Sequence, residues 1–149
     1  MPLHRELDLL ARGVKDRARK AIELMNADPI LKSFGVDKVV VNETLRDMAV
    51  QMAYFSRGRM PNTGDVQAMY KAAGLYPLSP AEAIKKITWT LDSKHIMGKA
   101  VDIAPSKGGV VWWAAPGEAW TRMGEIGESC GLTWGGRWKN KDNPHFEVV

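Results

Sequence analysis

Two histidines and two aspartates in the C-terminal half of the chain have the types and spacing needed for metal-dependent hydrolysis. His95 and Asp102 stand seven positions apart in Ser93–Asp102 (SKHIMGKAVD), and His145 lies in Asp142–Glu147 (DNPHFE). Catalytic zinc commonly takes three protein ligands from histidine and carboxylate side chains and keeps one position for water. We interpret His95, Asp102 and His145 as the three ligands of one zinc ion.

Asp142, three residues before His145, is the candidate general base. A metal that lowers the pKa of water towards 7 allows a nearby carboxylate to accept its proton and to pass it to the departing amine. Arg46 follows a predicted core strand and is a candidate for bidentate binding of a substrate carboxylate. The pattern therefore predicts metal-dependent hydrolysis, and the spacing alone does not give the substrate.

The spacing of the ligands favours a loop that enters a strand. Gly98 permits a tight reversal between His95 and Asp102. Residues 100–103 are predicted to form a strand in which Asp102 faces away from its apolar neighbours. If the last strand, 145–148, lies beside this one, the side chain of His145 meets the other two ligands.

Other segments have the patterns of helices and strands. An amphipathic helix is expected over 5–26, with Leu7, Leu10, Val14, Ala18, Ala21 and Met25 on one face. Further helices are expected over 47–56, 65–73, 79–86 and 117–130, and strands over 36–43, 110–113 and 132–134. Residues 104–109 read as a turn, and the segment 60–90 reads as a surface insertion that frames a cleft. The six tryptophans are expected to lie mostly in the core, with Trp138 the best candidate for an aromatic residue in the cleft.

Size and composition limit the class of protein. The 149 residues suit one domain, 1–149, without a separate cell-wall-binding domain. No apolar run approaches the roughly 20 residues of a membrane-spanning helix, and the N-terminus does not resemble a signal peptide. The single cysteine, Cys130, excludes an internal disulfide and a cysteine-rich metal site. The net charge of +4 favours anionic surroundings, but no basic cluster or motif indicates a nucleic-acid partner.

The two histidine-containing strings resemble those of the zinc peptidases of the D-Ala-D-Ala carboxypeptidase (VanY-like) group. Within that group the sequence is most similar to the phage L-alanyl-D-glutamate peptidases that serve as endolysins. The resemblance extends to Val41–Arg46 (VNETLR) with Gln51, Gly58 and Arg59 after it, and to Gly131–Gly136 (GLTWGG). It covers roughly residues 36–149.

The resemblance implies a small α+β fold of the hedgehog and D-Ala-D-Ala peptidase type. In this fold an antiparallel sheet carries the zinc site and helices pack on one side. The resemblance also implies Zn²⁺ on His95, Asp102 and His145, a base at Asp142, and substrate contacts from Arg46, Ser93 and Gln51.

The function implied is hydrolysis of the L-Ala–D-Glu bond of peptidoglycan stem peptides by a monomeric phage endolysin. Such an enzyme is made in the host cytoplasm without a signal peptide, is not inserted in the membrane, and acts on the cell wall after release. Two alternatives stay open. One is a D-Ala-D-Ala carboxypeptidase or dipeptidase of the same fold, and the other is a non-catalytic wall- or tail-associated binding module.

Overall fold

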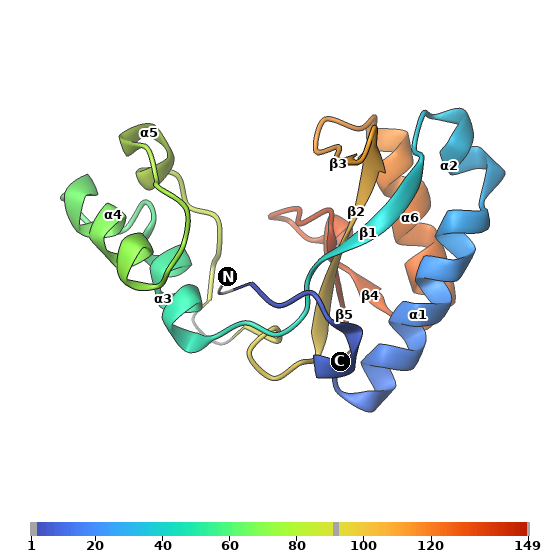
Figure 1. Ribbon diagram of the computed structural model, residues 1–149, viewed down its shortest axis with the longest axis horizontal. Coiled ribbons are helices and arrows are strands. Elements are labelled where there is room, and N and C mark those ends of the chain that lie inside the picture. Colours follow the sequence, from blue (N-terminus) through green and yellow to red (C-terminus); the bar gives the residue numbers. More distant parts are fainter. Residues whose placement is uncertain (1–2, 91–92, 149) are drawn as a thin grey trace.

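An antiparallel sheet forms the centre of the computed structural model, which describes residues 3–90 and 93–148. Within these residues the order of the main strands is β1-β2-β5-β4, and β3 pairs with β2 (Figure 1). The strands are β1 (Lys38–Glu43), β2 (Ala100–Lys107), β3 (Val110–Val111), β4 (Thr133–Trp134) and β5 (His145–Glu147). The expected α+β class with a small antiparallel sheet is confirmed.

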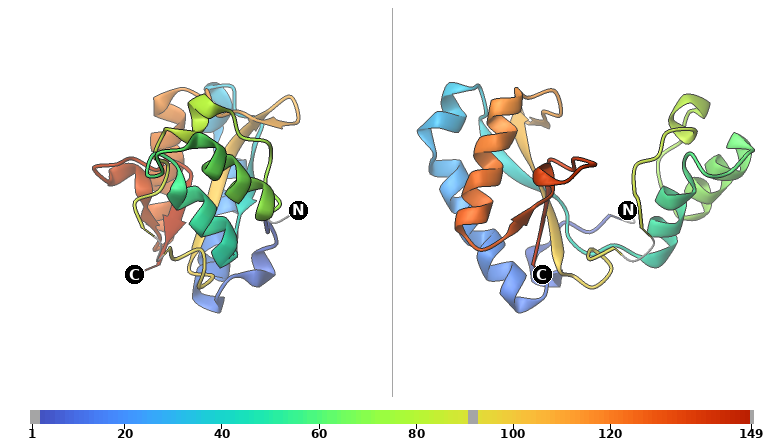
Figure 2. Two further views of the ribbon diagram at one scale, coloured as in Figure 1. Left: turned by 90° about the vertical axis from the view of Figure 1, so that its left-hand side faces the viewer. Right: turned by 180° about the vertical axis from the view of Figure 1, so that it is seen from behind.

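Three helices cover one face of this sheet: α1 (Arg12–Ala27), α2 (Pro29–Ser33) and α6 (Gly117–Ser129), as Figures 1 and 2 show. The expected apolar stripe is buried from Val14 to Met25 in α1, and Leu10, which precedes the helix, is buried as well. Val101 and Ile103 of β2 face the same core, which leaves Asp102 on the opposite face of the sheet. None of the helices in the described ranges is long and apolar enough to cross a membrane.

The predicted start of the first helix at residue 5 is wrong. Leu7–Leu9 form a short 3-10 helix (η1), and α1 begins only at Arg12. Leu10 is extended, and the backbone N–H of Ala11 donates to the carbonyl of Gly98. This long-range hydrogen bond ties the segment before α1 to the loop that carries His95.

Residues 48–83 form a separate helical lobe of three helices, α3 (Met48–Ser56), α4 (Thr63–Ala72) and α5 (Pro80–Ala83), on the side of the sheet away from α1 and α6 (Figure 1). The predicted surface insertion therefore has a small core of its own. This core contains Ala53, Val66, Tyr70, Leu78 and Ala83. The predicted start of α5 is confirmed, because Ser79 and Glu82 form a reciprocal capping box.

The strand that carries Asp102 is longer than predicted. β2 continues through Pro105 to Lys107, where a turn was expected, because β1 pairs with it as far as Ser106. The predicted strand 110–113 ends at Val111, and Trp113 leaves it to stack on Trp120. The expectation of mostly buried tryptophans is wrong for Trp89 and Trp113, which are both more than half exposed.

Candidate metal centre and active-site cleft

Asp102 and His145 lie directly opposite each other on neighbouring strands. β2 and β5 pair in antiparallel fashion, with Asp102 in register with His145. Opposite residues of an antiparallel pair project their side chains from the same face of the sheet. The pairing predicted from the sequence is thus present, and it points both side chains away from the helix-covered core.

His95 joins them from the turn that precedes β2. Ser93 Oγ accepts a hydrogen bond from the backbone N–H of His95, and the N–H of Gly98 donates to the His95 carbonyl. Gly98 has a positive φ of 68°, and a Cβ there would lie 3.0 Å from the carbonyl oxygen of Leu9. The glycine lets the chain reverse against the N-terminal segment and lead into β2.

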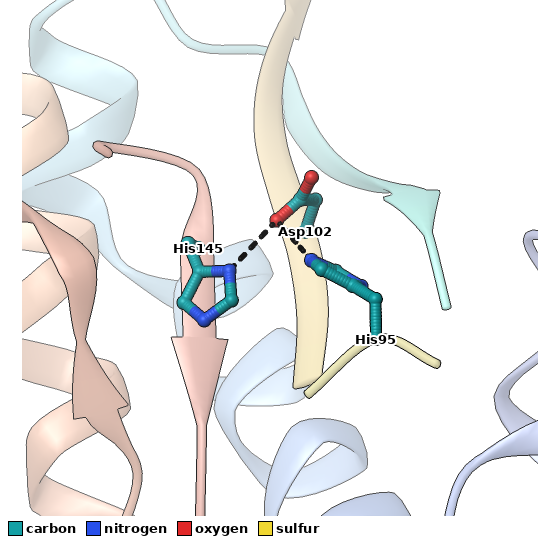
Figure 3. Close-up of side chains that lie close together, drawn as sticks. All are labelled: His95, Asp102 and His145. Carbon is teal, nitrogen blue, oxygen red and sulfur yellow. Dashed lines mark hydrogen bonds and ion pairs between the residues drawn. The ribbon is translucent and has the colours of Figure 1, made fainter. Parts of the chain in front are cut away.

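The three side chains converge on one point (Figure 3). Asp102 Oδ1 lies 3.2 Å from His95 Nε2 and 3.6 Å from His145 Nδ1. One potential ligand atom from each residue lies within 4.8 Å of the other two. His95 and His145 are only 2% and 5% exposed, so this is a buried cluster rather than a chance grouping on the surface.

The bonding partners of the two ring nitrogens that point away from Asp102 indicate whether this cluster can bind a metal ion. His95 Nδ1 lies 3.0 Å from the carbonyl oxygen of Thr44, and His145 Nε2 lies 2.8 Å from Glu147 Oε1. A carbonyl and a carboxylate only accept, so each ring can donate outward and, when neutral, offer its other nitrogen to a metal ion beside Asp102. This arrangement, with the second nitrogen of each histidine fixed by an acceptor, is typical of metal-ligating histidines. The two histidines and the aspartate therefore fit a catalytic zinc ion with an open coordination position.

The charges of the cluster depend on one another. Burial opposes ionisation of Asp102, but His95 and His145 outweigh it and hold the pKa of Asp102 well below its usual range. Burial likewise opposes protonation of His145, and its hydrogen bonds to Asp102 and Glu147 raise its pKa to about 9. A metal ion must therefore compete with a proton at Nδ1 of His145.

Asp142 stands at the edge of the cluster. Its Oδ2 lies 3.7 Å from His145 Nδ1, and its side chain is 48% exposed. Partial desolvation between the cleft walls, together with the negative charge of Asp102, raises the pKa of Asp142. The backbone N–H of Asp142 donates to the carbonyl of Gly135, and a Cβ on Gly135 would lie 2.6 Å from the Asp142 carbonyl oxygen. A glycine is required at this close approach, which places Asp142 beside the cluster.

Arg46, Ser93 and Gln51, which were predicted to contact the substrate, have different surroundings. Arg46 lies on the cleft wall, and its backbone N–H donates to the carbonyl of His95. Ser93 also lines the cleft, but its hydroxyl oxygen already accepts from His95. Gln51 is fully buried behind Arg46, with its amide oxygen bonded to Arg46 and its amide nitrogen bonded to Thr88 and Thr90. The structure therefore brings Arg46 and Ser93 to the cleft and leaves Gln51 in the layer behind it.

The cluster lies in a cleft of about 660 Å³ between the two lobes of the protein. The loop 138–142 forms one wall, where the ring of Trp138 lies 5.0 Å from that of His145. Tyr54 and the segment 87–90 contribute the opposite wall. The cleft has the volume of an ordinary ligand-binding pocket, and His95, Asp102 and His145 line it.

Several residues of the site were not assigned a role from the sequence. Glu147 lies two residues after His145 on the same strand, and its carboxylate bonds to Nε2 of His145. Side chains two residues apart in a strand lie on the same face, so the sequence could have indicated this contact. Lys94, Lys139 and Lys141 also line the cleft. Nothing in the sequence distinguishes these lysines from ordinary surface lysines. Thr44 acts through its backbone carbonyl, which side-chain patterns do not reveal.

Known proteins resemble this chain in sequence and in fold. Residues 86–148 match the family model described as D-alanyl-D-alanine carboxypeptidase. The structure is similar to the crystal structure of the Serratia marcescens L-Ala D-Glu endopeptidase ChiX, with 25% sequence identity and a TM-score of 0.58. The match covers 96% of this chain and 83% of ChiX. No curated protein sequence matches significantly.

A second solved structure shares the fold. It is a Zn(II) complex of a mutant of the vancomycin resistance D,D-pentapeptidase VanY from a VanB-type resistance cassette. The identity is 19% and the TM-score is 0.53, over 94% of this chain and 72% of VanY. The likeness to VanY concerns the fold alone, whereas the family model, ChiX and the cluster of His95, Asp102 and His145 support a metallopeptidase that is similar to the VanY-like zinc peptidases.

Proposed function

We propose that this protein is a zinc-dependent peptidase that hydrolyses the L-Ala–D-Glu bond of peptidoglycan stem peptides. The observation that carries the proposal is the convergence of His95, Asp102 and His145 on the floor of a cleft, with Asp142 at its edge. The likeness to the L-Ala D-Glu endopeptidase ChiX over most of both chains supports this choice of bond.

In this proposal His95 Nε2, Asp102 Oδ1 and His145 Nδ1 hold the zinc ion, the role expected for them from the sequence. When bound, zinc acts as a Lewis acid that polarises the scissile carbonyl and lowers the pKa of water. Thr44 and Glu147 keep the two imidazole rings in the required tautomers.

Asp142 and Arg46 act on the substrate. Asp142 accepts a proton from the attacking water and delivers it to the amine of D-Glu as the peptide bond breaks. Its raised pKa favours this exchange, because a stronger base takes the proton more readily. D-Glu is joined to the next residue of the stem peptide through its γ-carboxyl group, so its α-carboxylate is free, and Arg46 binds this carboxylate. Trp138 and Ser93 line the path of the peptide.

A second candidate function keeps the same residues and changes the bond. The family model that matches residues 86–148 is described as a D-alanyl-D-alanine carboxypeptidase, and VanY shares the fold. Under this alternative Arg46 binds the terminal carboxylate of D-Ala-D-Ala, and the enzyme releases D-Ala.

The proposed setting is that of a phage endolysin. The protein is made in the cytoplasm of the host bacterium and reaches the wall, as a monomer, when the membrane is breached during lysis. The net charge of +4 supports action at an anionic envelope.

Digestion of purified peptidoglycan, followed by mass spectrometry of the new termini, tests the proposal. Free carboxyl ends on L-Ala together with new amino ends on D-Glu are expected, and a chelator should abolish both. Release of D-Ala alone would instead establish the second candidate. Asp142→Asn should retain zinc and lower kcat by about 10²- to 10⁴-fold, whereas unchanged turnover would remove Asp142 from the mechanism.

A further inference from the structure

Glu43 is a buried acidic residue beside the cleft for which the proposed mechanism has no role. Its side chain is only 3% exposed, and it is the last residue of β1. A buried carboxylate is costly unless its oxygens have partners. Glu43 Oε2 has no hydrogen-bond partner among the described residues, so part of this cost is not offset locally.

A bulge in β1 places Glu43 on the cleft side of the sheet. Val41 pairs with Ile103, but the next pair joins Glu43 to Asp102, so Asn42 is the extra residue. Without it, Glu43 would share a face with Val39 and Val41, which pack against the core. A β-bulge of this kind redirects a side chain and occurs often beside active sites. Here it moves one carboxylate from the core face to the face that carries the candidate zinc ligand.

The redirected carboxylate holds one edge of the Arg46 guanidinium. Glu43 Oε1 accepts from Arg46 Nε at 2.8 Å and also from Nη2. Gln51 Oε1 accepts from Nη1 at 2.6 Å, and the ring of Tyr54 lies 4.9 Å from the guanidinium carbon. The Arg46 guanidinium is thus hydrogen-bonded to Glu43 and Gln51, and it lies over the ring of Tyr54.

This arrangement leaves part of Arg46 available. A guanidinium has five N–H groups, and these bonds use three of them. No described residue accepts from the remaining N–H of Nη1 and of Nη2. These two N–H groups, one on each terminal nitrogen, are left to donate to a ligand such as the oxygens of a carboxylate.

We infer that Glu43 is a positioning residue for Arg46: it fixes the guanidinium so that its free end binds the substrate carboxylate in one orientation. This inference rests on the proposed function for the identity of that carboxylate, the α-carboxylate of D-Glu. Gln51 and Tyr54 complete the support, and Gln51 joins it to the cleft wall through Thr88 and Thr90. Holding a binding group in advance matters, because small misplacements of a bound substrate lower the rate steeply.

Two peptides and a double-mutant cycle test the inference. One peptide contains L-Ala-γ-D-Glu with its free α-carboxylate, and the other carries a carboxamide at that position. Glu43→Gln keeps the size and one acceptor oxygen but removes the charge. It should lower kcat/KM about tenfold on the acid peptide, mainly through kcat, and less than about twofold on the amide. In an Arg46→Ala background the same change should have no further effect, because Glu43 acts only through Arg46.

Glu43→Asp is the second variant, for use if Glu43→Gln does not fold. It keeps the charge on a side chain one methylene shorter and should show the same selective loss on the acid peptide. Glu128→Gln is the matched control, since it removes one carboxylate from an exposed arginine pair with Arg137 and should leave both peptides unaffected. Equal losses on both peptides, or effects of Glu43 and Arg46 that simply add, would overturn the inference.

A readout without turnover separates this inference from the proposed function. Nuclear magnetic resonance should show a protected Nε–H of Arg46 in the zinc-loaded protein, and its exchange with water should be faster in Glu43→Gln. If neither peptide is cut but this protection depends on Glu43, the proposed bond is wrong and the positioning role stands. If the exchange rate does not change, Glu43 does not hold Arg46.

Discussion

His145 donates from Nε2 to Oε1 of Glu147 at 2.8 Å, two residues further along the same strand. This bond lowers the pKa of Glu147 and, in the neutral imidazole, leaves Nδ1 as the nitrogen that can bind the proposed metal ion. Lys94 lies 3.9 Å from the other oxygen of Glu147 and balances its charge. The carboxylate thus supports a ligand without contacting the proposed metal itself.

We therefore expect Glu147→Ala to weaken zinc binding by about 10- to 100-fold, because the ring of His145 loses its fixed tautomer and part of its basicity. Competition with a chromophoric chelator measures the affinity. Glu128→Ala removes a surface carboxylate and should leave the affinity unchanged. An equal affinity in Glu147→Ala and in the unaltered protein would contradict this role.

Strand pairing explains why the convergence of His95, Asp102 and His145 could be predicted from the sequence. The alternation Val101, Asp102, Ile103 fixes which face Asp102 takes, and the ligands His95 and His145 lie in short strings of characteristic residues. The structure adds the register of Asp102 opposite His145, which brings together strings that are far apart in the chain.

The cleft walls were less predictable. The bulge at Asn42 has no sequence signal, because an extra residue changes the pairing without changing the local pattern. The sequence predicted an insertion over 60–90 that frames a cleft, but not its helical core, because that core depends on contacts between separate segments, such as Val66 and Tyr70 with Ala53 and Leu78. Short amphipathic helices do not reveal which neighbour buries them.

Gly124 on α6 determines how closely the helix lies against β4. A Cβ at this position would lie 2.2 Å from Cδ2 of Trp134, a buried ring whose Nε1 donates to the carbonyl of Asn143. Gly124→Ala should therefore lower the free energy of unfolding by about 1–3 kcal/mol, since Trp134 must move. It should also lower activity, because Asn143 adjoins Asp142.

Thermal or denaturant unfolding measures the first effect. Gly13→Ala in the first turn of α1 is the matched control, because a Cβ there meets nothing within 4 Å. It should leave the protein unchanged or stabilise it by up to about 1 kcal/mol. If both alanine variants are equally stable, the close packing of α6 on β4 is not a constraint.

Asp28 links α2 to α6 and makes stability depend on pH. It accepts two hydrogen bonds from Arg122, each 2.9 Å long, and it caps α2 by accepting from the N–H of Leu31. The hydrogen bonds from Arg122 are the main reason that the pKa of Asp28 lies below its ordinary value of 3.8. Because the folded pKa lies below the unfolded one, this stabilisation is complete above the unfolded value and is lost as the pH falls through the folded value.

Asp28→Asn should therefore lower the free energy of unfolding at pH 7 by about 1–2 kcal/mol, a range reduced because the Arg122 side chain is one-third exposed. The difference from the unaltered protein should shrink as the pH falls below about 4. Urea unfolding of both proteins at a series of pH values measures this difference. The other titrating groups affect both proteins equally, so their contributions cancel in the difference. A difference that is constant from pH 7 to pH 3 would contradict the assignment.

Lys139 and Lys141 place positive charge on the cleft wall beside Asp142. Both are exposed and line the cleft, while Asp102, Asp142 and Glu147 supply its negative charges. Peptidoglycan stem peptides carry several carboxylates, so these lysines should attract the substrate without taking part in the chemistry. Replacing both with glutamine should raise KM about 3- to 10-fold at low ionic strength and leave kcat within about twofold.

The dependence on salt distinguishes this attraction from a structural effect. At about 0.5 M salt the charges are screened over a few ångströms, so the double variant and the unaltered protein should have similar KM values. Lys20 and Lys71, exposed residues of α1 and α4, provide a control with the same change in net charge. If replacing Lys20 and Lys71 raises KM as much, net charge and not the position of Lys139 and Lys141 controls binding. A KM increase that persists at high salt would show that the loop itself has been disturbed.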